Sequence, residues 1–331
     1  MLELRCHGTK PALKLSLRLL ILLTVPPLMW AGNAVVGRAM SGHVPPMTLN
    51  ALRWALAALL LLPFAWRALT PISRITQRWR YLLALGLFGV GMYNALQYLA
   101  LVTSTPLNVT LVAASMPVWM LAVGALFFGE RPRLNQLAGA ALSLLGVAVV
   151  IGRGSWQSLL SVQFVPGDMY ILLAAIGWAF YSWLLARPPA HMQGDQRPRA
   201  DEGWDWAGLL LVQALFGLLA AGSFSAVEQA MGAAPIRWSL PVIGGLLYVS
   251  LGASIAAYRC WGLGVAEGGP ALAAFFGNLT PLFAALLSGL LLDESPQPYH
   301  ALAFALIVGG IAVSMRGGAP TALAPSAKTE P

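Results

Sequence analysis

Two arginines, Arg53 and Arg259, stand inside long apolar stretches of the sequence. A charged side chain at membrane depth is costly, so each is a candidate binding residue by default. A guanidinium in a protected site can hold a carboxylate through two parallel hydrogen bonds. The alternative for each arginine is that its long side chain extends to the membrane surface or binds a backbone carbonyl. These two arginines are candidates for contact with a substrate.

Amide and aromatic side chains occur in the same kind of apolar stretch. Amides among aromatic rings suit a cavity that hydrogen-bonds and packs a small amphipathic solute. Amides can also link neighbouring helices, and rings can lie at the membrane surface. The candidates of this class for substrate binding are Trp30, Asn33, Tyr93, Asn94, Gln97, Trp178, Tyr181 and Asn278.

The positions of the acidic residues argue against a catalytic site at membrane depth. All twelve fall in tails, loops or expected helix ends, as do the four histidines. A membrane-embedded enzyme needs a nucleophile with a base, paired carboxylates or metal ligands at depth, and the sequence offers none. We therefore expect no enzymatic activity, no metal site and no cofactor.

Five residues are candidates for gating or coupling. Pro117 and Pro281 each remove a backbone donor and free a carbonyl one turn earlier, which gives a static kink or a hinge. Glu130 and Glu294 precede a proline at expected helix ends, where they serve as caps or gates. Glu267, at an expected helix mouth, is the one carboxylate that we would test as a proton carrier.

Composition indicates the elements that must position these side chains. The chain has 331 residues, of which 58% are hydrophobic and only 10% charged, against about 25% charged in a typical soluble domain. Unalternating apolar runs of this length predict an all-α integral membrane protein. Ten transmembrane helices are expected, at 17–37, 47–66, 79–101, 107–128, 135–152, 167–186, 206–224, 240–261, 270–291 and 299–315.

The distribution of lysine and arginine predicts the orientation. With the N-terminus in the cytoplasm, fifteen basic residues fall on that side and three on the other. The positive-inside rule therefore places both tails, 1–16 and 317–331, and the long loop 187–205 in the cytoplasm. The basic residues form no continuous stripe, which argues against nucleic-acid binding despite the net charge of +8.

An internal repeat is the most informative pattern. At a constant offset of 164 residues, Pro106, Pro117, Glu130 and Pro132 match Pro270, Pro281, Glu294 and Pro296. The repeats are 17–153 and 167–316, with five expected helices each. Because five is odd, the two repeats must cross the membrane in opposite senses. Inverted repeats are typical of secondary transporters, which bind substrate near the midplane between the halves.

Several motifs also resemble a known family. Trp30-Ala31-Gly32-Asn33, Arg53-Trp54-Ala55, Glu130-Arg131-Pro132 and Asn278-Leu279-Thr280-Pro281 are similar to the EamA-type repeat of the drug/metabolite transporter superfamily. The resemblance implies ten helices, a pseudo-twofold axis in the membrane plane and movement of small metabolites, commonly export of amino acids. Arg259 and the length of the loop 187–205 depart from the family pattern.

The combined expectation is a secondary active transporter in the cell (inner) membrane, a monomer or homodimer surrounded by the lipid bilayer. It exports a small amino-acid-like or other carboxylate-bearing metabolite by alternating access. The alternatives are an exporter of hydrophobic or cationic drugs and a passive channel.

Overall fold

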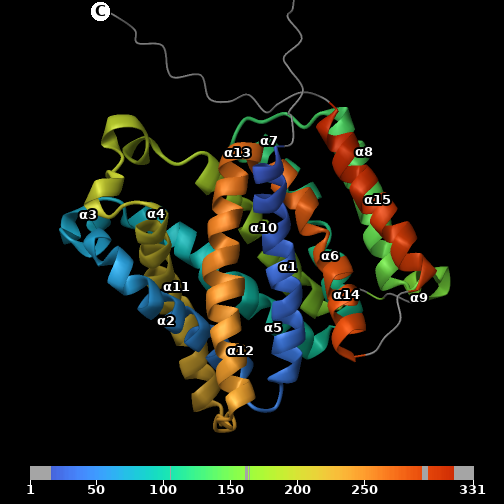
Figure 1. Cartoon of the computed structure of the whole chain (residues 1–331), viewed down its shortest axis with the longest axis horizontal. Coiled ribbons are helices and arrows are strands. Elements are labelled where there is room, and N and C mark those ends of the chain that lie inside the picture. Colours follow the sequence, from blue (N-terminus) through green and yellow to red (C-terminus); the bar gives the residue numbers. More distant parts are fainter. Residues whose placement is uncertain (1–15, 105, 161–162, 164, 293–296, 317–331) are drawn as a thin grey trace, which may run out of the picture.

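The computed structural model describes residues 16–104, 106–160, 163, 165–292 and 297–316, and this part of the chain is helical with no strand (Figure 1). The longer helices form a bundle in which the start of α1 and the end of α15 lie at the same end. The main helices are α1 (Leu17–Ala39), α2 (Pro46–Ala65), α4 (Trp79–Leu85), α5 (Tyr93–Thr103), α6 (Pro106–Ala113), α7 (Met116–Phe127), α8 (Leu134–Ile151), α10 (Pro166–Ala186), α11 (Trp206–Ala230), α12 (Leu240–Ser250), α13 (Ala257–Gly277), α14 (Thr280–Leu292) and α15 (Pro298–Met315). Short helical segments connect them: η1 (Trp66–Leu69), α3 (Ile72–Thr76), η2 (Gly86–Met92), α9 (Trp156–Leu160), η3 (Ala190–Met192), η4 (Gly194–Gln196), η5 (Ala200–Glu202) and η6 (Leu251–Ala256).

Seven helical stretches of the described residues are long and apolar enough to cross a membrane, against the ten expected. They are Leu17–Gly37, Pro46–Leu69, Leu134–Ile151, Pro166–Ala186, Trp206–Ala230, Leu240–Gly277 and Pro298–Met315. The other three expected helices, 79–101, 107–128 and 270–291, are present as shorter consecutive helices. The chain is therefore an all-helical, multi-pass membrane protein.

Two of the expected helices, 107–128 and 270–291, break at the prolines that are expected to kink them. Pro117 lies in the first turn of α7, and its i−4 residue, Ala113, is the last residue of α6. Pro281 lies in the first turn of α14, and its i−4 residue, Gly277, is the last residue of α13. A proline cannot donate to the carbonyl four residues earlier and clashes with it, which explains both positions.

A hydroxyl group binds a backbone carbonyl at each of these breaks, and at Pro281 that carbonyl is the i−4 one, Gly277 O. Ser115 Oγ donates to Val112 O at 2.5 Å, and Thr280 Oγ1 donates to Gly277 O at 2.7 Å. In the membrane, each open backbone group must find such a partner within the protein. At Pro281, the Thr280 hydroxyl therefore replaces the backbone donor that the proline lacks.

Two long helices contain a wide π-helical segment. The segment η2 joins α4 to α5, and η6 joins α12 to α13. A π-helical turn shifts the hydrogen-bond ladder by one residue, and such turns occur frequently at functional sites. Gly89 in η2 and Ala253 in η6 lie 164 residues apart, the offset of the sequence repeat.

The expected eighth helix does not end at 261. Instead α13 continues to Gly277 and is kinked at Gly269, whose φ of 82° lies in the left-handed region that favours glycine. Pro270 follows the kink directly. Similarly, α11 extends beyond the expected end at 224 to Ala230, where Glu228 accepts hydrogen bonds from the N–H groups of Met47 and Thr48 at 2.9 and 2.7 Å. That carboxylate caps the first turn of α2, which has no cap of its own.

Small residues allow α8 and α15 to pack backbone against backbone at one edge of the bundle (Figure 1). A Cβ added at Gly139 would stand 2.6 Å from Gly310 O, and one added at Gly310 would stand 2.7 Å from Gly139 O. Asn135 strengthens the pair by donating from Nδ2 to Ser314 O at 2.9 Å. Close contact of this kind is the main source of helix association in lipid.

Replacing Gly310 by alanine is expected to lower the free energy of unfolding by about 1–3 kcal/mol, because rigid backbone atoms of α8 must move. The adjacent Gly309→Ala is the matched control, since its Cβ would meet only Leu142 Cδ2 at 3.4 Å. Thermal unfolding of both variants in detergent measures the difference. Equal midpoints would contradict the close packing of α8 and α15.

Candidate functional site

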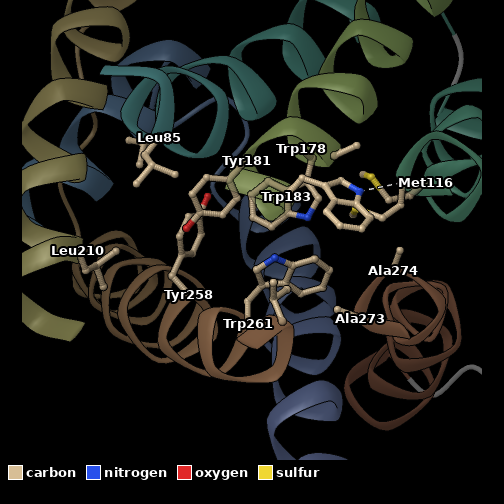
Figure 2. Packing of buried hydrophobic residues seen from close by; sticks show 14 of the residues in the cluster. Leu85, Met116, Trp178, Tyr181, Trp183, Leu210, Tyr258, Trp261, Ala273 and Ala274 are labelled. Carbon is tan, nitrogen blue, oxygen red and sulfur yellow. Dashed lines mark hydrogen bonds between the residues drawn. The ribbon is translucent and has the colours of Figure 1, made fainter. Parts of the chain in front are cut away.

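Aromatic rings from five helices, α1, α2, α5, α10 and α13, meet inside the bundle. We call Trp30, Trp54, Tyr93, Trp178, Tyr181, Tyr258 and Trp261 the central aromatic cluster. Trp178 is at its centre, with ring centroids 5.3 Å from Trp30 and 5.5 Å from Tyr258, both in edge-to-face geometry. Figure 2 shows Trp178 and Tyr181 of α10 facing Tyr258 and Trp261 of α13. The cluster therefore joins the first and second halves of the chain.

Three side chains of the cluster donate to backbone or hydroxyl oxygens, whereas Trp54 Nε1 is buried with no hydrogen-bond partner within the described residues. Tyr258 donates its hydroxyl hydrogen to Gly89 O in η2, and Trp30 Nε1 donates to Ala253 O in η6 at 3.2 Å. Trp261 Nε1 donates to Ser182 Oγ at 3.1 Å. Each wide π-helical segment thus offers one carbonyl to a cluster side chain from the other half.

Arg53 lies beside the cluster and is 4% exposed. Its Nε donates to Ser254 Oγ at 2.5 Å, and its two terminal nitrogens donate to Asn33 Oδ1 at 3.4 Å and Ala253 O at 2.9 Å. Ala253 O therefore accepts from both Arg53 and Trp30. This shared acceptor makes the charged group and the aromatic cluster one continuous site.

Two buried amides extend the polar region along α2. Asn94 Nδ2 of α5 donates to Asn50 Oδ1 at 3.2 Å, and Asn50 lies one turn before Arg53. The Nδ2 group of Asn50 is buried and has no hydrogen-bond partner within the described residues. Gln97, one turn after Asn94 on α5, is half-buried. An amide donor in such a position is available to a ligand or a water molecule.

Two expected site residues lie apart from this group. Arg259 is exposed, and its guanidinium covers the ring of Trp206 at 4.2 Å from the centroid, a cation–π contact near the start of α11. Asn278 is buried between α13 and α14, and its Nδ2 donates to Ser143 Oγ of α8 at 2.9 Å. These contacts do not involve Arg53, and the roles of both residues in substrate binding stay predictions.

The expected gating carboxylates form ion pairs between helices. Glu130, after α7, pairs with Arg187 at the end of α10, and Arg187 also donates to Phe128 O at 2.7 Å. Glu267 of α13 pairs with Arg18 of α1 at 2.7 Å. Glu294 lies outside the described residues.

Sequence reasoning missed several members of the site. Ser254 and the Ala253 carbonyl give no sequence signal, because their role depends on the π-helical turn. Asn50 could have been found, since it stands three residues before Arg53 on the same helix. No group of three or more His, Cys, Asp or Glu side chains that could hold a metal ion occurs in the described part of the chain.

Comparison with known proteins identifies the family. The sequence profile described as EamA-like transporter family matches residues 17–152 and again 165–316. The chain belongs to the EamA-like transporter family. This EamA protein is therefore a membrane transporter and not an enzyme.

Characterised and uncharacterised relatives agree with that family. The chain is 26% identical to the "Aromatic amino acid exporter YddG" of Ancylobacter novellus, over 87% of this chain and 93% of the relative. It is 27% identical to a "Probable amino-acid metabolite efflux pump" of Escherichia coli K12, over 90% and 94% of the two chains. A solved crystal structure with 23% sequence identity superposes with a TM-score of 0.69, covering 89% of this chain and 96% of the other, which supports the fold.

Ser254→Ala is expected to lower the free energy of unfolding by about 1–3 kcal/mol. It removes the oxygen that accepts a hydrogen bond from Arg53 Nε, so the buried guanidinium loses one of its partners. Ser223→Ala is the control. Its hydroxyl is exposed and donates only to Leu219 O within its own helix, at 2.7 Å. Thermal unfolding in detergent compares the two variants, and an unchanged Ser254→Ala protein would show that this hydrogen bond is not needed.

Proposed function

We propose that this EamA protein is a secondary active transporter that exports a small amino-acid-like or other carboxylate-bearing metabolite. The observation that carries the proposal is the buried guanidinium of Arg53, which is continuous with the central aromatic cluster. A guanidinium can bind a substrate carboxylate bidentately, and the rings can pack its apolar part. The names of the amino-acid exporter and the efflux pump among the relatives support the same substrate class and direction.

The proposed architecture is ten transmembrane helices in two inverted five-helix repeats. The family profile matches the chain twice, over 17–152 and 165–316. The breaks at Pro117 and Pro281 and the wide segments η2 and η6 recur at the offset of the sequence repeat. With the start of α1 and the end of α15 at one end of the bundle, both termini face the cytoplasm from a cell (inner) membrane, as the positive-inside rule predicts (Figure 1).

Alternating access requires contacts at the cytoplasmic end that close and open. The Glu130–Arg187 pair joins the ends of α7 and α10, and the Arg18–Glu267 pair joins α1 to α13. One turn before Arg187 on α10, Trp183 Nε1 donates to Met120 O of α7 at 2.8 Å. We infer that these contacts hold the cytoplasmic side closed and separate when substrate enters from that side.

Arg53→Gln is expected to abolish saturable counterflow of a labelled amino acid in proteoliposomes, because the carboxylate loses its charged partner. Arg259→Gln is the matched control and is expected to retain counterflow, since Arg259 covers Trp206 away from the site. The assay measures counterflow of labelled amino acids, dicarboxylates, sugars and quaternary ammonium compounds by each variant and by the wild type. Exchange of cations alone, or equal loss in both variants, would overturn the proposed substrate class, and flux without saturation would indicate a channel.

Exchanging the charges of the proposed gate tests alternating access. Glu130→Arg alone places two arginines together and is expected to reduce the counterflow rate, whereas Glu130→Arg with Arg187→Glu should restore it at least in part. The side chains are about one third exposed, so the pair contributes only about 0.5–1 kcal/mol and the fold should persist. A double variant as slow as the single variant would show that the pair is not a gate.

A further inference from the structure

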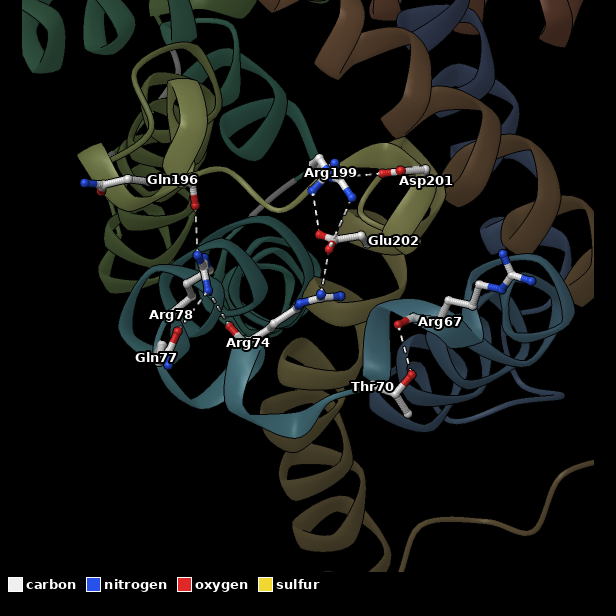
Figure 3. A network of polar contacts seen from close by, with 9 residues as sticks. All are labelled: Arg67, Thr70, Arg74, Gln77, Arg78, Gln196, Arg199, Asp201 and Glu202. Carbon is white, nitrogen blue, oxygen red and sulfur yellow. Dashed lines mark hydrogen bonds and ion pairs between the residues drawn. The ribbon is translucent and has the colours of Figure 1, made fainter.

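The loop 187–205 packs against α3 and the start of α4. Met192 and Trp204 are buried. At Gly203, whose φ is 87°, an added Cβ would stand only 2.6 Å from Arg67 Cβ. On the other side of the loop, Arg78 donates to His191 O at 3.2 Å. It also donates to Gln196 O at 2.9 Å (Figure 3). The loop is therefore a preformed structure.

Between this loop and α3 lies a polar pocket of about 310 Å³. Two sets of arginines line it, one from the α3 region and one from the loop, with only two carboxylates opposite them. The charged lining residues are Arg74, Arg78, Arg197, Arg199, Asp195 and Glu202. We call this the arginine pocket, and its charged groups sum to a net positive charge.

Neighbouring carboxylates offset only part of the positive charge of these arginines. Arg74 pairs with Glu202 at 2.7 Å, and Arg199 lies 3.4 Å from Asp201 (Figure 3). Burial lowers the pKa of the Arg78 guanidinium, and the positive charge of Arg74 lowers it further. Within the described residues, the exposed side chain of Arg197 makes no hydrogen bond or ion pair. The pocket thus presents unused guanidinium donors and a positive potential to an anion.

The surroundings place the arginine pocket at the membrane surface. Trp66 of η1, Ile72 of α3 and Trp79 at the start of α4 are large apolar side chains that remain exposed. Tryptophans are enriched at the headgroup level of membranes, where their rings contact both phases. The anions at that depth are the phosphates of anionic lipids, and basic pockets between membrane helices bind such headgroups.

We propose that the arginine pocket binds the phosphate of an anionic phospholipid in the adjoining leaflet, with Arg197 and Arg199 donating to its oxygens. The planar guanidinium groups suit phosphate oxygens, which accept paired hydrogen bonds. A bound headgroup links the loop to α3 and thereby stabilises the contact between the two halves of the chain. The binding is independent of the identity of the transported solute.

The test measures ligand-dependent thermal stability of the full-length protein in a mild, uncharged detergent. The probes are short-chain phosphatidylglycerol, short-chain phosphatidylcholine and inorganic phosphate. Phosphatidylglycerol is expected to raise the unfolding midpoint saturably, which gives an apparent Kd, because a ligand of the folded state stabilises it. Phosphatidylcholine is expected to leave the midpoint unchanged.

Arg197→Gln is expected to weaken phosphatidylglycerol binding about fivefold, and Arg197→Gln with Arg199→Gln about 25-fold. The control is Arg80→Gln with Arg131→Gln, which removes two exposed arginines outside the pocket and should leave the Kd unchanged. Arg197 makes no contact that the fold needs, so its variant keeps the test valid even if the double variant unfolds. Equal weakening by pocket and control variants, or equal stabilisation by phosphatidylcholine, would overturn the proposal. Inorganic phosphate that binds as tightly as phosphatidylglycerol would also overturn it and indicate a soluble phosphate-bearing ligand.

Discussion

The site depends on one constraint: a backbone carbonyl inside a membrane must find a donor within the protein. In the wide turns η2 and η6, in the middle of two long helices, side chains of distant segments donate to backbone carbonyls. Gly89 O accepts from Tyr258, and Ala253 O accepts from Trp30 and Arg53. The same bonds that satisfy the backbone therefore bring the aromatic cluster and the guanidinium to one place.

This arrangement gives a physical route from substrate binding to helix movement. The Arg53 donors that a carboxylate would use are already directed at Ser254 and Ala253 in η6 and at Asn33 in α1. Under the proposed function, a bound carboxylate would compete with these acceptors and weaken the contact between α2 and η6. Trp30 can keep Ala253 O satisfied during that exchange, so the cost of breaking the Arg53 bond is reduced. Such an exchange couples the site to the helices that line it, as the proposed alternating access requires.

The sequence predicts the helical class, most helix positions and the core of the site, but not the local departures from an α-helix. Trp30, Asn33, Arg53, Asn94, Trp178 and Tyr181 stand out as polar or aromatic groups in apolar runs, and the structure gathers them near the midpoint of the bundle. The prolines mark the breaks before α7 and α14, although hydropathy alone reads each pair of helices as one. No residue in the sequence marks the π-helical turns in this way. Unless these turns are known, neither Ser254 nor the Ala253 carbonyl can be recognised as part of the site. For Arg259 the sequence leaves a substrate contact and an extended surface position open, because hydropathy does not indicate which face of α13 a charge occupies. The structure places its guanidinium over Trp206, which is distant in sequence.

The two kinds of packing in the bundle fit different mechanical roles. The α8–α15 pair packs backbone against backbone at Gly139 and Gly310, where even an added Cβ would clash, which leaves little room for rearrangement there. The centre instead uses edge-to-face rings, each pair contributing only about 0.5–1.5 kcal/mol beyond its buried area, and hydrogen bonds with alternative partners. Interactions of that size can be exchanged one at a time without unfolding the chain. A transporter needs this combination, because the centre must rearrange around a solute while the outer helices keep the two halves in register.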